Sequence, residues 1–221
     1  MNHFPETRRT RIQVCGITRL EDAVLAAALG VDALGFVFYP ASPRYIEPAA
    51  AAAIIRQLPP FVSAVGLFVN ASQSEIDAVL NACPLDILQL HGDESPAFCA
   101  AQTRRVIKAV AVQEADDTAR IADFDCAVLL DAKAPSGVYG GAGKAFDWAL
   151  VEELEHAHPL ILAGGLHADN VAQALAVRHW DALDVSSGVE ISPGIKDGEK
   201  LQRFLAAVHG SEHYAGNGVV D

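Results

Sequence analysis

The sequence predicts an α/β fold in which one domain forms a closed (β/α)8 barrel of the TIM type. Eight short runs of aliphatic and β-branched residues alternate with eight stretches of helical spacing. The runs are apolar almost throughout, which indicates a parallel sheet with both faces buried. No segment is left over, and closure of eight equal units removes both edges of the sheet. The length of 221 residues is close to the lower end for such barrels.

The expected elements follow each other in strict alternation. Each expected strand is a run rich in Val, Ile, Leu and Ala, and each expected helix is an Ala-rich amphipathic stretch. The strands are expected at 11–16, 33–38, 62–69, 87–91, 106–112, 127–131, 160–163 and 182–186, and the helices at 20–29, 48–58, 73–81, 95–103, 115–121, 147–156, 169–177 and 198–208. Without a linker or composition break, we expect one domain over 1–221, with frayed ends at 1–9 and 210–221.

Composition and charge exclude several classes of partner. Lys and Arg number 16 against 28 Asp and Glu, and the formal net charge of −12 argues against nucleic acid and against an anionic membrane surface. No apolar run approaches the ~20 residues of a spanning helix, and the polar amino end does not resemble a secretory signal. The four cysteines lack metal-ligand spacing. We therefore expect a cytoplasmic protein with reduced thiols, no metal and no cofactor.

Glycines follow the last two expected strands, at Gly164-Gly165 and at Ser187-Gly188. In (β/α)8 barrels the loops after strands seven and eight commonly bind phosphate, because backbone N–H groups can approach the anion closely there. Each pair alone could simply make a tight turn. Both pairs at these two positions predict a site for a small phosphorylated molecule.

Reactive side chains also follow the expected strands. Cys15 is either a thiol base or nucleophile, or an inert buried residue. Asp131 closes an apolar run, so desolvation could raise its pKa and suit it to a general acid, unless loop N–H groups satisfy its carboxylate. Arg44 could clamp a carboxylate, and His91 could donate a hydrogen bond. The stretch 140–144 suggests a flap. Together these groups predict a phosphate-handling barrel for proton-transfer isomerisation or a related lyase step.

At these residues the chain resembles the phosphoribosylanthranilate isomerases of tryptophan biosynthesis. The similar segments are VCGITRLEDA, GFVFYPASPRYI, VGLFVN, LQLHGDE, LLDAKA, YGGAGKAFDW, LAGGLHADNV and DVSSGVEISPGIKD, between residues 14 and 197. Ile191 departs from the small polar residue expected there. The resemblance implies an Amadori rearrangement of N-(5-phosphoribosyl)anthranilate to 1-(2-carboxyphenylamino)-1-deoxyribulose 5-phosphate, with no metal and no redox step.

The resemblance also implies roles for individual residues. Asp131 matches the general acid that opens the ribose ring, and Cys15 matches the general base that takes the proton from ribose C2. Arg44 matches the residue that faces the anthranilate. Polar residues His91 and Asp184 match the lining of the site, and the phosphate cradle is matched by Gly164, Gly165, Ser187 and Gly188.

Three alternatives stay open on the residues alone. A lyase similar to indole-glycerol-phosphate synthase would need a lysine acid, and Lys108 sits mid-strand. A pentose-phosphate epimerase would need several metal ligands. A non-catalytic phosphate-binding barrel could lack Cys15 or Asp131, and both are present. The partner expected in each case is a small phosphorylated molecule, and the chain is expected to be a monomer or a homodimer.

Overall fold

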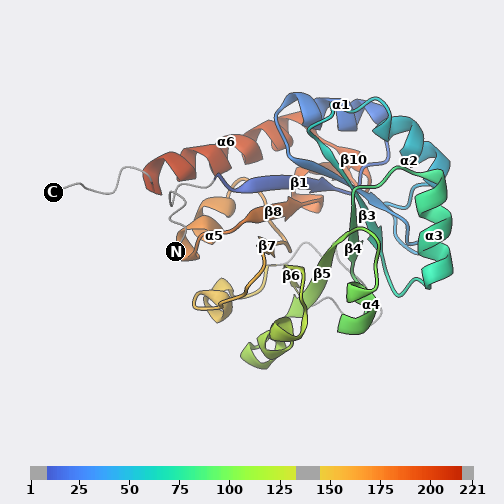
Figure 1. Ribbon diagram of the computed structural model, residues 1–221. Coiled ribbons are helices and arrows are strands. Elements are labelled where there is room, and N and C mark those ends of the chain that lie inside the picture. Colours follow the sequence, from blue (N-terminus) through green and yellow to red (C-terminus); the bar gives the residue numbers. More distant parts are fainter. Residues whose placement is uncertain (1–8, 133–144, 216–221) are drawn as a thin grey trace.

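The computed structural model describes residues 9–132 and 145–215 as a closed eight-stranded parallel barrel (Figure 1). Each strand pairs with the next along the chain, and β1 pairs with β8 through the register Gln13↔Asp184. The predicted barrel is therefore confirmed. The strands are β1 (Arg11–Cys15), β2 (Ala33–Val37), β3 (Ser63–Phe68), β4 (Ile87–Leu90), β5 (Arg105–Val112), β6 (Ala127–Ala132), β7 (Leu160–Leu162) and β8 (Ala182–Val185).

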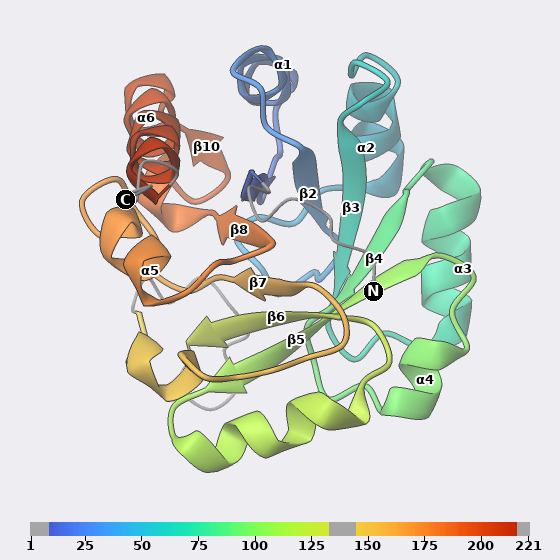
Figure 2. The same ribbon diagram turned by 60° about the vertical axis from the view of Figure 1, so that its left-hand side comes forward.

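The α-helices form an outer ring around the strands (Figure 2). Local sequence explains where several begin: Ser72 and Glu75 form a reciprocal capping box before α3, and a proline occupies the first turn of α2 and of α4. The helices are α1 (Leu20–Ala28), α2 (Pro48–Ile55), α3 (Gln73–Ala82), α4 (Pro96–Ala100), α5 (Val171–Val177) and α6 (Gly198–Ala215). Within the described ranges, no helix is long and apolar enough to cross a membrane.

Two predicted α-helices are wrong, because 3₁₀ helices η1 (Ala115–Asp123) and η2 (Trp148–Val151) occupy those stretches. In η1 the Asp117 carboxylate accepts from the backbone N–H groups of Gln113 and Glu114 at 2.8 and 3.1 Å, which favours a tight local turn over an α-helix. Asp147 caps η2 through the N–H of Ala149 at 3.1 Å.

The carboxyl-terminal part contains further differences from the prediction. An unpredicted antiparallel hairpin, β9 (Glu190–Ser192) and β10 (Ile195–Lys196), follows β8. Ile191, the departure from the family pattern, lies on this hairpin and is 70% exposed. The last helix, predicted at 198–208, is longer, because α6 continues through Gly210 to Ala215.

Alternation along each strand separates the barrel interior from the outer core. On β5, Ile107 and Ala109 belong to the cluster inside the barrel, whereas Val110 and Val112 belong to the larger core between strands and helices. The same alternation directs polar residues of other strands into the barrel, and His91 follows β4 at the carboxyl-terminal mouth. The inward polar residues are Gln13, Cys15, Gln89, Asp131 and Asp184.

Candidate active site

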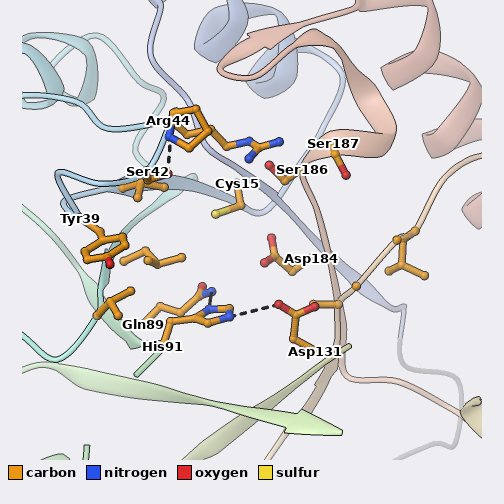
Figure 3. A pocket seen from close by; sticks show the side chains of 18 of the residues that line it. Cys15, Tyr39, Ser42, Arg44, Gln89, His91, Asp131, Asp184, Ser186 and Ser187 are labelled. Atoms are coloured by element: carbon orange, nitrogen blue, oxygen red, sulfur yellow. Dashed lines mark hydrogen bonds and ion pairs between the residues drawn. The ribbon is translucent and has the colours of Figure 1, made fainter. Parts of the chain in front are cut away.

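A pocket of about 290 Å³ opens at the carboxyl ends of the barrel strands (Figure 3). It collects every predicted site residue except Gly188: its lining includes Cys15, Arg44, His91, Asp131, Gly164, Gly165, Asp184 and Ser187. In Figure 3, Cys15 and Asp184 lie between Arg44 and the His91–Asp131 pair. Residues on six different strands or their following loops thus meet at one mouth, as the barrel geometry requires.

A buried chain of hydrogen bonds fixes the orientation of His91. Gln13 Nε2 donates to Gln89 Oε1 at 2.8 Å across the barrel, so the amide nitrogen of Gln89 points at His91 Nδ1, 3.3 Å away. Because an amide NH2 group can only donate, Nδ1 must accept and the imidazole proton lies on Nε2. That nitrogen is 3.1 Å from Asp131 Oδ2 and donates to it. Sequence reasoning missed both glutamines, although their inward positions on β1 and β4 follow from the alternation.

Two carboxyl groups share the centre of the pocket. Asp131 accepts from His91 and from the N–H of Ala132, the latter at 2.8 Å, so N–H groups satisfy its carboxylate. Burial, and then the charge of Asp131, raise the pKa of Asp184 to about 7, against weaker opposing effects of His91 and Lys196. Among the described residues, Asp184 Oδ1 has no hydrogen-bond partner although it is buried. The pocket therefore offers a carboxyl group that holds a proton near neutrality.

Cys15 is buried, and its surroundings strongly disfavour ionisation of the thiol. Burial, followed by the carboxylate of Asp184, raises the pKa of Cys15 far above its usual value. Lys196 and Arg44 act in the opposite direction, and the backbone of Gly16 contributes least. The two cationic side chains therefore favour the thiolate more than the strand-end amide does.

Arg44 already has a protein partner, which the sequence did not predict. Its Nε donates to Glu190 Oε1 at 3.0 Å and its Nη2 donates to Glu190 Oε2 at 2.6 Å. Although burial raises the pKa of Glu190, hydrogen bonds and charges of Arg44 and Lys196 hold it below the usual value. Glu190 therefore stays ionised and fixes the guanidinium at the pocket wall.

The predicted phosphate loops lie beside each other after β7 and β8. Gly164 and Gly165 have φ angles of +84° and +63°, a conformation that favours glycine, and both line the pocket. Asn170 Nδ2 donates to the Gly165 carbonyl at 2.9 Å and holds this loop. Ser187 lines the pocket, whereas Gly188 packs behind it against the carbonyl of Leu166.

The other predicted features, a flap, a lyase acid and a set of metal ligands, are not found in the pocket among the described residues. The proposed flap at 140–144 lies outside the described residues. Lys108 points away from the barrel interior and forms a buried ion pair with Glu94 at 2.8 Å, so it does not stand where a lyase acid would be needed. In the described part of the chain, no group of three or more His, Cys, Asp or Glu residues could hold a metal ion.

The fold and pocket define a (β/α)8-barrel protein with its site at the carboxyl ends of the strands. A family model described as N-(5'-phosphoribosyl)anthranilate (PRA) isomerase matches residues 12–207. The chain is similar to the N-(5'-phosphoribosyl)anthranilate isomerase of Citrifermentans bemidjiense, with 53% identity over 198 residues, 89% of this chain and 96% of that protein. The chain belongs to the PRA isomerase family.

Solved structures agree with this assignment. The phosphoribosyl anthranilate isomerase of Thermotoga maritima superimposes with a TM-score of 0.84 at 44% identity, covering 91% of this chain and 99% of that one. A second structure of a phosphoribosyl anthranilate isomerase was solved in complex with reduced 1-(o-carboxyphenylamino)-1-deoxyribulose 5-phosphate. It has a TM-score of 0.81 and 40% identity, and covers 91% of this chain and 99% of that one.

Proposed function

We propose that this chain is the isomerase that converts N-(5-phosphoribosyl)anthranilate to 1-(2-carboxyphenylamino)-1-deoxyribulose 5-phosphate in tryptophan biosynthesis. The observation that carries the proposal is the arrangement of one pocket. A thiol, Cys15, and two carboxyl groups, Asp131 and Asp184, face the same space, which the glycine loops after β7 and β8 also border. An Amadori rearrangement needs an acid and a base and no electron acceptor, and a phosphorylated substrate also needs a phosphate site.

The acid step opens the ribose ring. In its protonated form Asp131 gives the proton to the ring oxygen while the C1–O bond breaks, and the anthranilate nitrogen forms a Schiff base with C1. The Asp131 carboxylate that is left accepts from His91 Nε2–H and from the N–H of Ala132. The raised pKa of Asp184, about 7, supports this step because the two carboxyl groups together hold a proton near neutrality. The Nε2–H of His91 orients the Asp131 carboxylate for the transfer.

The base step moves the second proton. Cys15, as the thiolate, removes the proton from ribose C2; the electron pair shifts into C1–C2 and neutralises the Schiff base as an enolamine. Tautomerisation of the enolamine gives the ketone. The opposite positions of Cys15 and Asp131 across the pocket support this division of labour.

Groups that could bind the substrate surround Cys15 and Asp131. The bonds to Glu190 occupy Nε and Nη2 of Arg44, so the anthranilate carboxylate would meet Nη1. The loops at Gly164-Gly165 and Ser187-Gly188 would take the phosphate. The buried hydroxyl of Ser186, which has no hydrogen-bond partner among the described residues, is a further group available to the substrate.

A fluorescence assay with freshly generated phosphoribosylanthranilate tests the proposal. We expect rapid loss of substrate fluorescence that EDTA does not change. Asp131→Asn should abolish turnover but still bind inorganic phosphate, and Cys15→Ser should lower kcat by roughly 10²-fold or more. No turnover by the wild-type chain, with phosphate still bound, would redirect the search to another phosphorylated sugar. Near-normal turnover of either variant would remove that residue from its role.

The proposal extends to the domain and the assembly. The barrel strands and the pocket all come from one continuous domain, consistent with a single-domain enzyme over the described ranges. The oligomeric state, monomer or homodimer, stays a prediction.

A further inference from the structure

A buried cation contacts the end of β1 and has no part in the reaction steps above. Lys196, on β10, donates from Nζ to the carbonyl oxygen of Cys15 and to Glu190 Oε1, the latter at 2.7 Å. Its side chain is fully buried at 0% exposure. Burying an ammonium group is costly, so its position against the backbone of Cys15 requires an explanation.

The charges around Lys196 do not cancel. Glu190 is the shared partner of Lys196 and Arg44, so two cations meet one carboxylate. Asp22, whose Oδ2 accepts from the backbone N–H of Lys196 at 3.0 Å, is already paired with Arg19 at 2.7 Å. The side chain of Arg44 crosses directly over Gly16: an ideal Cβ atom at Gly16 would lie 2.5 Å from Arg44 Cδ. We call these three side chains, Arg44, Glu190 and Lys196, the cationic cluster. It places a net positive charge beside the turn that follows β1.

The thiol of Cys15 experiences charges of both signs. Asp184 on β8 carries the negative charge that opposes ionisation, and burial acts in the same direction. The positive charges come from Lys196 on β10 and from Arg44 in the loop after β2. A thiol in this position can lose its proton only if those cations compensate for burial.

We propose that Lys196 is a positioning residue for Cys15: its ammonium group, held by Glu190, stabilises the thiolate and fixes the end of β1 that carries it. The thiol proton leaves to solvent through the open pocket, and the resulting thiolate is the base of the proposed reaction. The inference rests on the proposed function for the use of that thiolate, but the state of the thiol can be measured without substrate.

A purely structural role for Lys196 makes the opposite prediction. If Lys196 served only to attach the β9–β10 hairpin, its loss would loosen the loop and expose Cys15. An exposed thiol ionises more easily and reacts faster. If Lys196 acts by its charge, its loss leaves the thiol buried beside Asp184 with less compensation, and the thiol reacts more slowly. The sign of the change therefore separates the two roles.

The experiment is alkylation of the full chain by iodoacetamide without substrate, as a function of pH, with labelling of the Cys15 peptide quantified by mass spectrometry. Lys196→Met should slow labelling of Cys15 about tenfold at a fixed pH below the thiol pKa, the effect of about one pKa unit. Lys196→Arg keeps the charge and should stay near the wild-type rate. Lys200→Met is the matched control: this exposed lysine donates to the backbone carbonyl of Glu190 at 2.7 Å. It should leave the rate unchanged.

Each outcome decides the inference. The inference is supported if Cys15 is labelled more slowly in Lys196→Met, while Lys196→Arg and Lys200→Met are both labelled at the wild-type rate. An unchanged or faster rate in Lys196→Met overturns it, as does equal slowing in Lys200→Met. Turnover of phosphoribosylanthranilate by the wild-type chain is scored separately. An active enzyme with unchanged labelling refutes only the role of Lys196, whereas an inactive wild-type chain refutes the proposed function whatever the labelling shows.

Discussion

Two buried lysine–glutamate pairs hold loops on opposite sides of this barrel, and they differ in the charge they leave behind. Glu94, after β4, and Lys108, on β5, balance each other at 2.8 Å, and Lys108 also donates to the carbonyl of Gly92 at 2.6 Å. Lys196 and Arg44 share the carboxylate of Glu190, which follows β8, so these three side chains together carry a net positive charge. A buried lysine–glutamate pair can thus hold a loop without net charge, or, when a second cation such as Arg44 joins it, create a positive electrostatic potential nearby.

The largest effect is expected from breaking the neutral pair. Lys108→Met leaves the Glu94 carboxylate buried at 4% side-chain exposure without its cation, so the free energy of unfolding should fall by about 3–5 kcal/mol. Urea unfolding measures this loss. The double variant Lys108→Met/Glu94→Gln should recover part of it, because no buried charge remains. Labelling of Cys15 should stay at the wild-type rate; a loss below 1 kcal/mol would contradict the comparison.

The next effect concerns Asp184, which lies between the two sides of the pocket. Its folded-state pKa is raised from 3.8 to about 7, so between these values the folded chain binds more protons than the unfolded chain. Stability therefore falls as pH rises through this window. Asp184→Asn removes that dependence, and its stability relative to wild type should grow by roughly 4 kcal/mol between pH 4 and pH 8.

Urea unfolding of both proteins at a series of pH values measures this growth. Asp77→Asn on α3, an exposed site, is the control, and its difference from wild type should not follow the same curve. A difference for Asp184→Asn that stays constant over the whole range would show that the folded chain does not hold this proton.

A smaller effect is expected from the carboxylate of the cationic cluster. Glu190→Gln weakens the bidentate contact that orients Arg44, so KM for phosphoribosylanthranilate should rise about tenfold while kcat changes less. Steady-state kinetics measure both constants. Glu94→Gln changes the other pair in the same way and should leave KM near wild type. An equal rise of KM in both variants would mean that loop integrity, not Arg44, sets substrate affinity.

The sequence predicts the strands well because burial on both faces makes each one a continuous apolar run. It fails where local polar groups compete with helix formation, as at Asp117 in η1. The positions of Cys15, His91 and Asp131 in the pocket follow from their places at strand ends, since parallel strands end at the same mouth.

The electrostatic setting of these residues could not be predicted in the same way. The contact between Lys196 and the backbone of Cys15 joins residues 181 positions apart, and it forms only when β8 closes on β1. A contact between residues so far apart in the chain leaves no local sequence pattern from which it could be predicted. The partner of Arg44, Glu190, likewise lies on a hairpin that is too short and too exposed at Ile191 to resemble a strand.

The closure of β1 by β8 also has a consequence for the chain during synthesis. Cys15 is made near the beginning, whereas Asp184 and Lys196, which lie beside it in the folded barrel, are made near the end. Until the ribosome has released β8 and the hairpin, β1 lacks one of the two strands that it pairs with. Completion of the barrel therefore buries this thiol at the same moment as it forms the pocket that the thiol lines.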